Sequence, residues 1–93
     1  MIKKTLNNEN LSQLELYYDN ILVGKIEYLK TKYNINYSYI YVNPEYRGQK
    51  ISKQLAYIAY DNYKQHNLKT KVTCKVLRNI LENNDEFNEM IFD

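Results

Sequence analysis

The hydrophobic pattern of this chain changes from strand spacing to helical spacing at a loop over residues 43–50, and this change constrains the fold more than any other feature. Before the loop, residues 35–42 are dense in β-branched and aromatic side chains, which favours a strand. After the loop, side chains recur at helical spacing up to about residue 66: Ile51, Leu55, Ile58, Ala59 and Asn62. The loop itself holds Pro44, the only proline of the chain, and Gly48. The pattern therefore predicts a strand that leads through a stiffened loop into a helix.

Shorter periodic segments precede this strand–loop–helix unit. Residues 14–18 alternate as a half-buried strand does, and a polar turn leads into a returning strand over 21–29. Gly24, inside that second strand, marks a bulge or a close backbone approach. Since short connections join these strands to the one over 35–42, we expect an antiparallel meander.

The segments after the long helix predict one further strand and one further helix. The strand over 68–74 follows a helix that crosses back over the sheet, so it should lie parallel to the strand over 35–42. A helical stretch over 76–83 follows, and the tail over 85–93 carries apolar side chains able to dock on the core: Phe87, Met90, Ile91 and Phe92. The expected order is β-β-β-α-β-α, an α+β fold whose mixed sheet joins an antiparallel meander to one parallel crossover. The length of 93 residues suits one domain over residues 1–93.

Composition argues against several classes of protein. The net charge of +2 at pH 7 lacks the strong basic excess of most nucleic-acid binders, so charge gives no reason to expect DNA as a partner, although it does not exclude RNA. No apolar run approaches the roughly 20 residues that cross a bilayer, and Met1 opens no signal-peptide pattern. The single cysteine forms no intrachain disulfide, which fits the reducing cytoplasm. With one histidine and one cysteine, we expect no metal site.

The loop over 43–50 has the features of an anion site. The N-terminus of a helix presents unpaired N–H groups and the positive end of the helix dipole, which stabilise a bound phosphate. Arg47 and Lys50 add cationic donors beside the helix start, and Gly48 lets the backbone approach a ligand closely. A basic, glycine-bearing turn before a helix also serves purely structural ends, so the residues alone leave both interpretations open.

The sequence around this loop resembles a known family. The run VNPEYRGQKISKQLAYIAYDNYKQHNLK, over residues 42–69, is similar to the acetyl-CoA segment of the GNAT superfamily of N-acetyltransferases, in which a strand delivers V-x-P-E-x-R-G-x-G-I-A to a long helix. The strand KTKVTCK and the acidic-aromatic ending Asp85-Glu86-Phe87 resemble the short, single-domain branch of that superfamily. The resemblance covers residues 21–92 and is most specific over 42–74. It implies a GNAT-like fold, acetyl-CoA as co-substrate and an amine as acceptor.

The resemblance also implies which residues bind the coenzyme. Backbone amides near Tyr41 and Val42 would meet the pantetheine arm and the thioester, between the strands over 35–42 and 68–74. The pyrophosphate would be held by the loop and the helix start: Arg47, Gly48, Gln49, Lys50, Ile51 and Ser52. Arg47 fills the first position of the family motif Q/R-x-x-G-x-G/A, whereas Lys50 and Ser52 replace its small residues. A lysine at position 50 either crowds the pyrophosphate or supplies a charge to it.

Cys74 ends the strand over 68–74, where the resemblance places the acetyl group. A thiol there could protonate the leaving thiolate or accept the acetyl group as a covalent relay. A small buried residue at a strand end is the alternative interpretation, because free cysteine is among the most buried residue types. His66, at the expected end of the long helix, is predicted to cap that helix at the surface.

Three functions follow as hypotheses. The first is an N-acetyltransferase that moves an acetyl group from acetyl-CoA to an amine. The second is a non-catalytic relative that binds CoA or another anion through a changed pyrophosphate loop. The third is an RNA-binding domain whose Tyr37, Tyr39 and Tyr41 lie on one strand face and stack on bases, although that face would equally serve as core beneath the helix. The sequence names neither the amine nor the oligomeric state, and it is compatible with a monomer.

Overall fold

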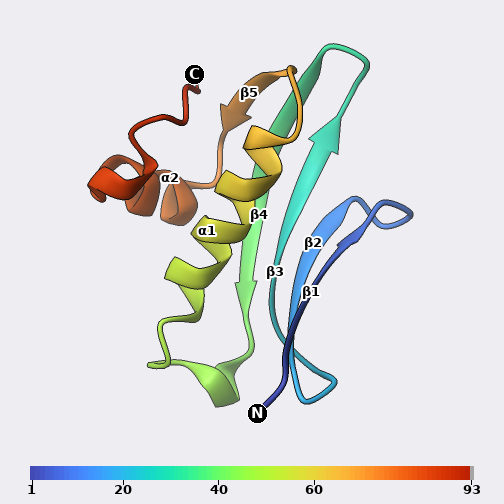
Figure 1. The fold of residues 1–93 in the computed structure, drawn as a ribbon, viewed down its shortest axis with the longest axis vertical. Coiled ribbons are helices and arrows are strands. Elements are labelled where there is room, and N and C mark those ends of the chain that lie inside the picture. The colour runs from blue at the N-terminus through green and yellow to red at the C-terminus, as the bar shows by residue number, and fades with distance from the viewer. Residues whose placement is uncertain (93) are drawn as a thin grey trace.

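A five-stranded mixed sheet forms one layer of the molecule, and helices pack on one of its faces (Figure 1). The computed structural model describes residues 1–92. The strands are β1 (Lys3–Asn8), β2 (Gln13–Tyr18), β3 (Ile21–Lys30), β4 (Asn34–Val42) and β5 (Lys69–Val72). The helices are α1 (Ile51–Lys64) and α2 (Lys75–Glu82), and the short 3-10 turns are η1 (Pro44–Tyr46) and η2 (Asp85–Phe87). The expected α+β fold with a mixed sheet is confirmed.

The strands lie in the sheet in their order along the chain, β1-β2-β3-β4-β5. The first four are antiparallel to their neighbours, whereas β5 runs parallel to β4 after the crossover through α1. β4 and β5 pair only from Asn34↔Lys69 to Tyr37↔Val72. The expected meander and the expected parallel crossover are therefore both present.

The sequence pattern predicts no strand before residue 14, yet β1 lies at the edge of the sheet. It pairs with β2 from Lys3↔Tyr18 to Asn8↔Gln13. Its side chains are exposed except that of Asn8, which is half-buried. Such a strand leaves no hydrophobic alternation in the sequence, because backbone hydrogen bonds and not side-chain burial hold it in place.

The core lies between the sheet and the helices. It combines apolar side chains of β2, β3 and β4 with one face each of α1 and α2, and it includes Leu14, Ile26, Tyr37, Leu55, Leu77 and Phe87. Gly24 of β3 allows a close approach to α1, since a Cβ atom there would lie 2.9 Å from Ile51 Cγ2 and 2.9 Å from Leu55 Cδ1. A β-bulge also interrupts the β2–β3 register beside this glycine. Both features that the sequence suggests for Gly24 therefore occur.

A second β-bulge reverses the faces of the outer half of β4. The β3–β4 register shifts by one residue at Ser38, which has no partner residue on β3. Tyr37 is fully buried beneath α1, whereas Tyr39 has 50% of its surface exposed. Tyr41 follows Tyr39 in regular register and shares its face. The prediction that Tyr37, Tyr39 and Tyr41 lie on one face is therefore wrong, because one extra residue reverses the alternation.

The buried hydroxyl of Tyr37 fixes the end of α1 to the sheet. It donates to Asn62 Oδ1 at 2.6 Å and lies 3.3 Å from His66 Nε2. The other ring nitrogen, His66 Nδ1, accepts the Leu68 backbone N–H at 3.3 Å. The neutral ring therefore carries its proton on Nε2 and donates it to the Tyr37 oxygen. His66 is thus a half-buried member of a hydrogen-bond relay and not the surface cap that the sequence predicts, and α1 itself ends at Lys64.

The relay makes the stability of the fold depend on pH. Burial, with the ammonium of Lys30 nearby, holds the pKa of His66 below its ordinary 6.5. The unfolded chain therefore binds a proton at a higher pH than the folded chain does. The contribution of His66 to stability is complete above pH 6.5 and is lost as the pH falls through the folded pKa. We expect the free energy of unfolding to decline over this window in the wild type and to stay level in His66→Gln, as measured by urea denaturation at several pH values.

Two carboxylates complicate this measurement only at lower pH. Glu15 and Glu86 have pKa values lowered from 4.5, so their effects begin below that value. Equal slopes for the wild type and His66→Gln between about pH 5 and pH 7 would show that the relay does not hold a neutral imidazole.

Candidate functional site

The sheet opens between β4 and β5 just after Tyr37. The backbone carbonyl of Tyr37 accepts both the Thr73 N–H at 3.2 Å and the Cys74 N–H at 3.3 Å. Beyond these bonds the strands separate, since β5 ends at Val72 whereas β4 continues to Val42 paired with β3. The edge of β4 over residues 38–42 is therefore left uncovered by β5.

Backbone groups of this free edge point away from β3. Asn43 N donates to the carbonyl of Val23 on β3 at 2.8 Å, which makes these two residues a hydrogen-bonded pair. Hydrogen-bonded and non-hydrogen-bonded pairs alternate along an antiparallel ladder, so Val42 and Ile40 belong to pairs of the second kind. Their N–H and C=O groups consequently face the side that β5 has left, whereas those of Tyr41 face β3.

A cavity of about 530 Å³ lies beside this edge, within the size range of small-molecule sites. Its walls come from β4, the loop after it, the first turn of α1 and the first turn of α2: Ile40, Val42, Arg47, Gly48, Lys50, Ile51, Ser52 and Val76. Tyr41 and Gln49 are the only predicted coenzyme-binding residues that do not line it. The alternation along β4 could have found Ile40, which lies two residues from Val42. No sequence signal points to Val76, because tertiary packing alone places α2 at the cavity.

The loop reaches α1 through two left-handed residues. Gly48 has φ +86°, and Lys50 has φ +59° and ψ +32°. Lys50 thus adopts a conformation that glycine takes freely and that costs other residues about 1–2 kcal/mol. The motif that this loop resembles has glycine at position 50, and the left-handed backbone is the physical reason for it. Here a lysine occupies that left-handed position.

Side chains on both sides of the loop hold it in place. Asn43 Oδ1 accepts a backbone N–H of η1 at 3.0 Å, and Asn43 Nδ2 donates to the Leu22 carbonyl of β3 at 3.2 Å. On the helix side, Gln54 Nε2 donates to the Gln49 carbonyl at 3.4 Å, and Gln54 Oε1 accepts the Tyr18 hydroxyl at 2.7 Å. The loop is therefore tied to β2, β3 and α1 before any ligand arrives.

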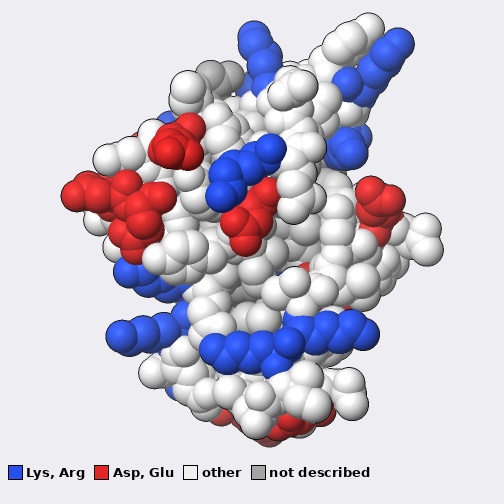
Figure 2. All heavy atoms as spheres, in the orientation of Figure 1, with Lys and Arg blue, Asp and Glu red and all other residues white. Residues whose placement is uncertain are grey.

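The start of α1 is open toward the cavity. The Gln54 N–H bonds the Lys50 carbonyl at 3.2 Å, so the amides of residues 51–53 precede the first intrahelical bond, and no side chain caps the helix. Within residues 1–92, neither Arg47 nor Lys50 has an ion-pair partner. Figure 2 shows Lys and Arg side chains gathered around this end of α1, whereas acidic side chains gather over α2 and η2. The helix start therefore offers unpaired N–H groups beside free cations.

Cys74 lies at the closed end of the opening and not in the cavity wall. It is 9% exposed and belongs to the buried core. Its N–H donates to the Tyr37 carbonyl, and its own carbonyl accepts the Arg78 N–H at 2.9 Å as α2 begins. The structure thus places Cys74 beside the point where β4 and β5 separate, and the chemical role of its thiol stays a prediction.

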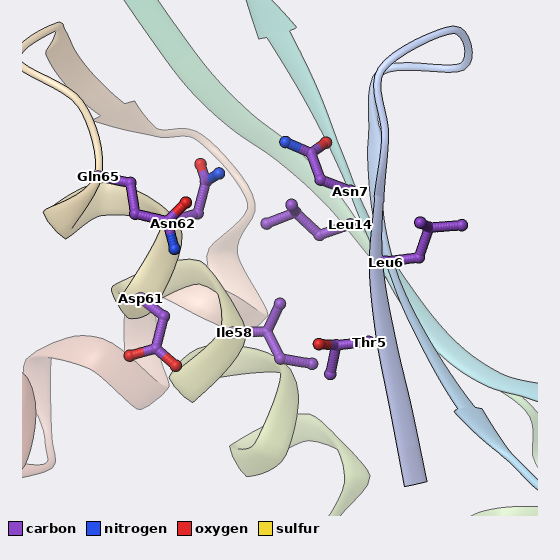
Figure 3. Close-up of a pocket in the computed structure, with 8 residues that line it drawn as sticks. All are labelled: Thr5, Leu6, Asn7, Leu14, Ile58, Asp61, Asn62 and Gln65. Carbon is purple, nitrogen blue, oxygen red and sulfur yellow. The ribbon is translucent and has the colours of Figure 1, made fainter.

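A second cavity, of about 250 Å³, lies on the other flank of α1. Figure 3 shows Thr5, Asn7 and Leu14 of β1 and β2 pointing toward α1, while Leu6 points away. Across the gap lie Ile58, Asp61 and Asn62 of α1 and Gln65, the residue that follows the helix. No residue that the sequence assigns to the site lines this cavity. The candidate site is therefore the cavity at the start of α1.

Two searches of the described residues bear on other kinds of site. In residues 1–92, no group of three or more His, Cys, Asp or Glu side chains is arranged to hold a metal ion. In the same residues, no helix is both long enough and apolar enough to cross a membrane.

Comparison with known proteins identifies the family to which the chain belongs. The model of the GCN5-related N-acetyl-transferase family matches residues 13–90. The chain belongs to this family. The crystal structure of the ribosomal-protein-alanine N-acetyltransferase from Brucella melitensis biovar Abortus 2308 has the same fold, with a TM-score of 0.60 and 21% sequence identity. The similarity covers 75% of this chain and 59% of that chain. Among curated protein sequences, none matches the chain.

The left-handed conformation of Lys50 can be tested by its effect on stability. Lys50→Gly and Lys50→Ala both remove the charge, but only glycine relieves the left-handed backbone. We expect Lys50→Gly to unfold at a temperature several degrees above Lys50→Ala, since about 1 kcal/mol corresponds to about 4–8 °C in a domain of this size. The greater freedom of glycine in the unfolded chain reduces this gain. Equal melting temperatures would show that position 50 is not strained in solution.

Proposed function

We propose that the protein transfers an acetyl group from acetyl-CoA to an amine. Its family consists of N-acetyltransferases, which supports acetyl transfer as the reaction class. The observation that carries the proposal is that a free strand edge and an uncapped helix start meet in one cavity. These two features match the two parts of the coenzyme, a chain of amides and a pyrophosphate.

The helix start fits the pyrophosphate. A doubly negative group is stabilised by unpaired N–H groups at a helix N-terminus, and residues 51–53 present such groups. Arg47 can bind two phosphate oxygens at once, and Lys50 adds a point charge. Both side chains are exposed, so neither must break an ion pair to reach a ligand. In this proposal Lys50 supplies charge to the pyrophosphate.

The edge of β4 fits the pantetheine arm. The amide groups of the arm need backbone partners in an extended line, and Ile40 and Val42 present their N–H and C=O groups on the open side of the strand. Acetyl-CoA supplies the acetyl group as an activated thioester. The apolar side chains of Ile40, Val42 and Val76 line the cavity beside this edge. A backbone N–H of this free edge is a suitable donor toward a carbonyl oxygen on which negative charge develops.

Cys74 is the proposed proton donor to the departing thiolate. Its thiol gives up a proton to the coenzyme sulfur and regains the proton that the amine loses, so the transfer is balanced. Its backbone position beside the Tyr37 carbonyl supports this role, because an arm that runs from the start of α1 along the edge of β4 would end toward that carbonyl. Burial of the thiol supports the competing view that Cys74 only packs.

A non-catalytic relative that binds CoA is the second candidate. Lys50 and Ser52 depart from the family motif, and both line the cavity. The same binding surface serves either function, so only an assay of transfer separates them. The RNA-binding hypothesis loses one of its three stacking side chains, because Tyr37 is buried.

Binding of the coenzyme is tested by thermal unfolding with acetyl-CoA. A ligand at 100 times its dissociation constant adds about 2.7 kcal/mol to stability, which raises the melting temperature by several degrees. We expect this rise in the wild type and a smaller one in Arg47→Gln. Lys32→Gln removes a cation from the β3–β4 turn and should behave as the wild type. No rise for the wild type at millimolar acetyl-CoA contradicts both the enzyme and the binding module.

The role of Cys74 is tested by separating binding from turnover. With acetyl-CoA and a panel of amines, we expect Cys74→Ala to lower kcat by at least about 100-fold, the usual contribution of a general acid. Its affinity for CoA, measured by calorimetry, should be unchanged. Cys74→Ser keeps the volume and a weaker acid, so it should retain part of the activity. Full activity in Cys74→Ala would assign the residue to packing, and binding without transfer by the wild type would favour the non-catalytic relative.

A further inference from the structure

The outward side of α1 carries a stripe of long polar side chains that holds the C-terminal segment of the protein. The stripe consists of Lys53, Tyr57, Tyr60 and Tyr63, which follow one another at helical spacing. The segment after α2, residues 85–91, runs along it. Tyr60 donates to Glu89 Oε2 at 2.8 Å, Tyr63 donates to the Glu89 carbonyl at 3.2 Å, and the Ile91 N–H donates to the Tyr63 hydroxyl at 3.1 Å. These three hydrogen bonds dock the segment on α1.

Phe87 anchors this segment. It is 1% exposed, and its ring lies 5.0 Å from that of Tyr57 and 5.7 Å from that of Tyr60, measured between centroids. The neighbouring residue, Glu86, is thereby held in place by packing and not by its charge alone. Its carboxylate reaches the first turn of α1.

Glu86 binds a cation that belongs to the helix start. Lys53 Nζ lies 2.9 Å from Glu86 Oε1, and the same oxygen accepts the Tyr57 hydroxyl at 3.0 Å. The hydrogen bond from Lys53 lowers the pKa of Glu86, and the same bond raises the pKa of Lys53, so both groups are charged at neutral pH. Lys53 follows Ser52, which lines the cavity, and long side chains on a helix lean toward its N-terminus. Lys53 itself does not line the cavity, but it is a cation of the first turn of α1, next to a lining residue, and the docked C-terminal segment neutralises it.

We propose that Glu86 competes with the phosphates of the coenzyme for Lys53, so that the docked C-terminal segment weakens coenzyme binding and coenzyme binding loosens the segment. This inference rests on the proposed function of the cavity. The two effects are equal by thermodynamic linkage, because one cation serves either the carboxylate or the phosphate. The acidic surface over α2 and η2, visible in Figure 2, adds repulsion between the docked segment and an anionic ligand.

The first test compares two isosteric variants of the full chain by calorimetry with CoA. In Glu86→Gln the amide oxygen still accepts the Tyr57 hydroxyl, but the negative charge that faces Lys53 is gone. We expect CoA to bind Glu86→Gln about two- to five-fold more tightly than the wild type, the range typical of exposed ion pairs. Glu89→Gln removes an equal charge from the same segment without touching Lys53, and we expect its affinity to change less. In the Lys53→Gln background, Glu86→Gln should have no effect on affinity.

The second test follows amide hydrogen exchange of residues 85–91. We expect these amides to exchange faster when CoA is bound to the wild type, because Lys53 has left Glu86. Binding of CoA by the wild type with equal affinities for Glu86→Gln and Glu89→Gln, or with unchanged exchange, overturns the inference and leaves the proposed function standing. Binding by Glu86→Gln alone confirms the competition in its strongest form. Failure of every variant to bind CoA overturns the inference together with the proposed function.

Discussion

The backbone and side chain of Tyr37 together decide where the sheet is closed and where it is open. Its carbonyl takes two N–H groups from the end of β5, and its hydroxyl joins α1 through Asn62 and His66. One residue after it, the bulge at Ser38 turns β4 so that its outer half pairs only with β3. The free edge, the cavity beside it and the position of α1 all follow from this junction. A fully buried tyrosine suits the task, since it supplies both a large apolar ring and a polar tip that needs partners.

The loop after β4 places a lysine at a left-handed position that glycine occupies in the family motif. Gly48 and Lys50 both have positive φ. Glycine takes this left-handed conformation easily, so one of the two positions is occupied by the favoured residue and the other by a lysine. The hydrogen bonds of Asn43 and Gln54 hold the flanks of the loop and offset the conformational cost of the left-handed Lys50 between them. The sequence departs from the motif at position 50, yet Lys50 adopts the left-handed conformation that glycine takes freely. The lysine also adds a positive charge beside the start of α1.

Much of the fold could be predicted from the sequence because its elements are periodic. The switch from strand spacing to helical spacing at residues 43–50 identified β4, the loop and α1, and the short polar turns identified the meander. The edge strand β1 could not be predicted because its side chains are exposed, and a strand held by its backbone leaves no hydrophobic pattern in the sequence. The bulge at Ser38 could not be predicted for a different reason. One unpaired serine has no sequence signature, yet it reverses the faces of the β4 residues after it.

The candidate site was only partly predictable, for the same physical reasons. Residues of the loop and of the first turn of α1 are adjacent in sequence, so a motif could find them together. Val76 and Glu86 come to this region through the packing of α2 and η2, which no local pattern encodes. The burial of Cys74 likewise depends on where β5 ends against β4. Its chemistry stays a prediction until turnover is measured.

The short parallel pairing of β5 has a consequence for the order in which the chain folds. The hairpins of β1 to β4 join neighbours in sequence and close small loops, whereas the pairing of β5 with β4 closes a loop that contains the whole of α1. The cavity needs β4, α1 and α2 together, so it is complete only when these distant segments have packed. A nascent or partly unfolded chain that retains its meander would thus have a sheet but no place to bind, and ligand binding reports on the completed fold.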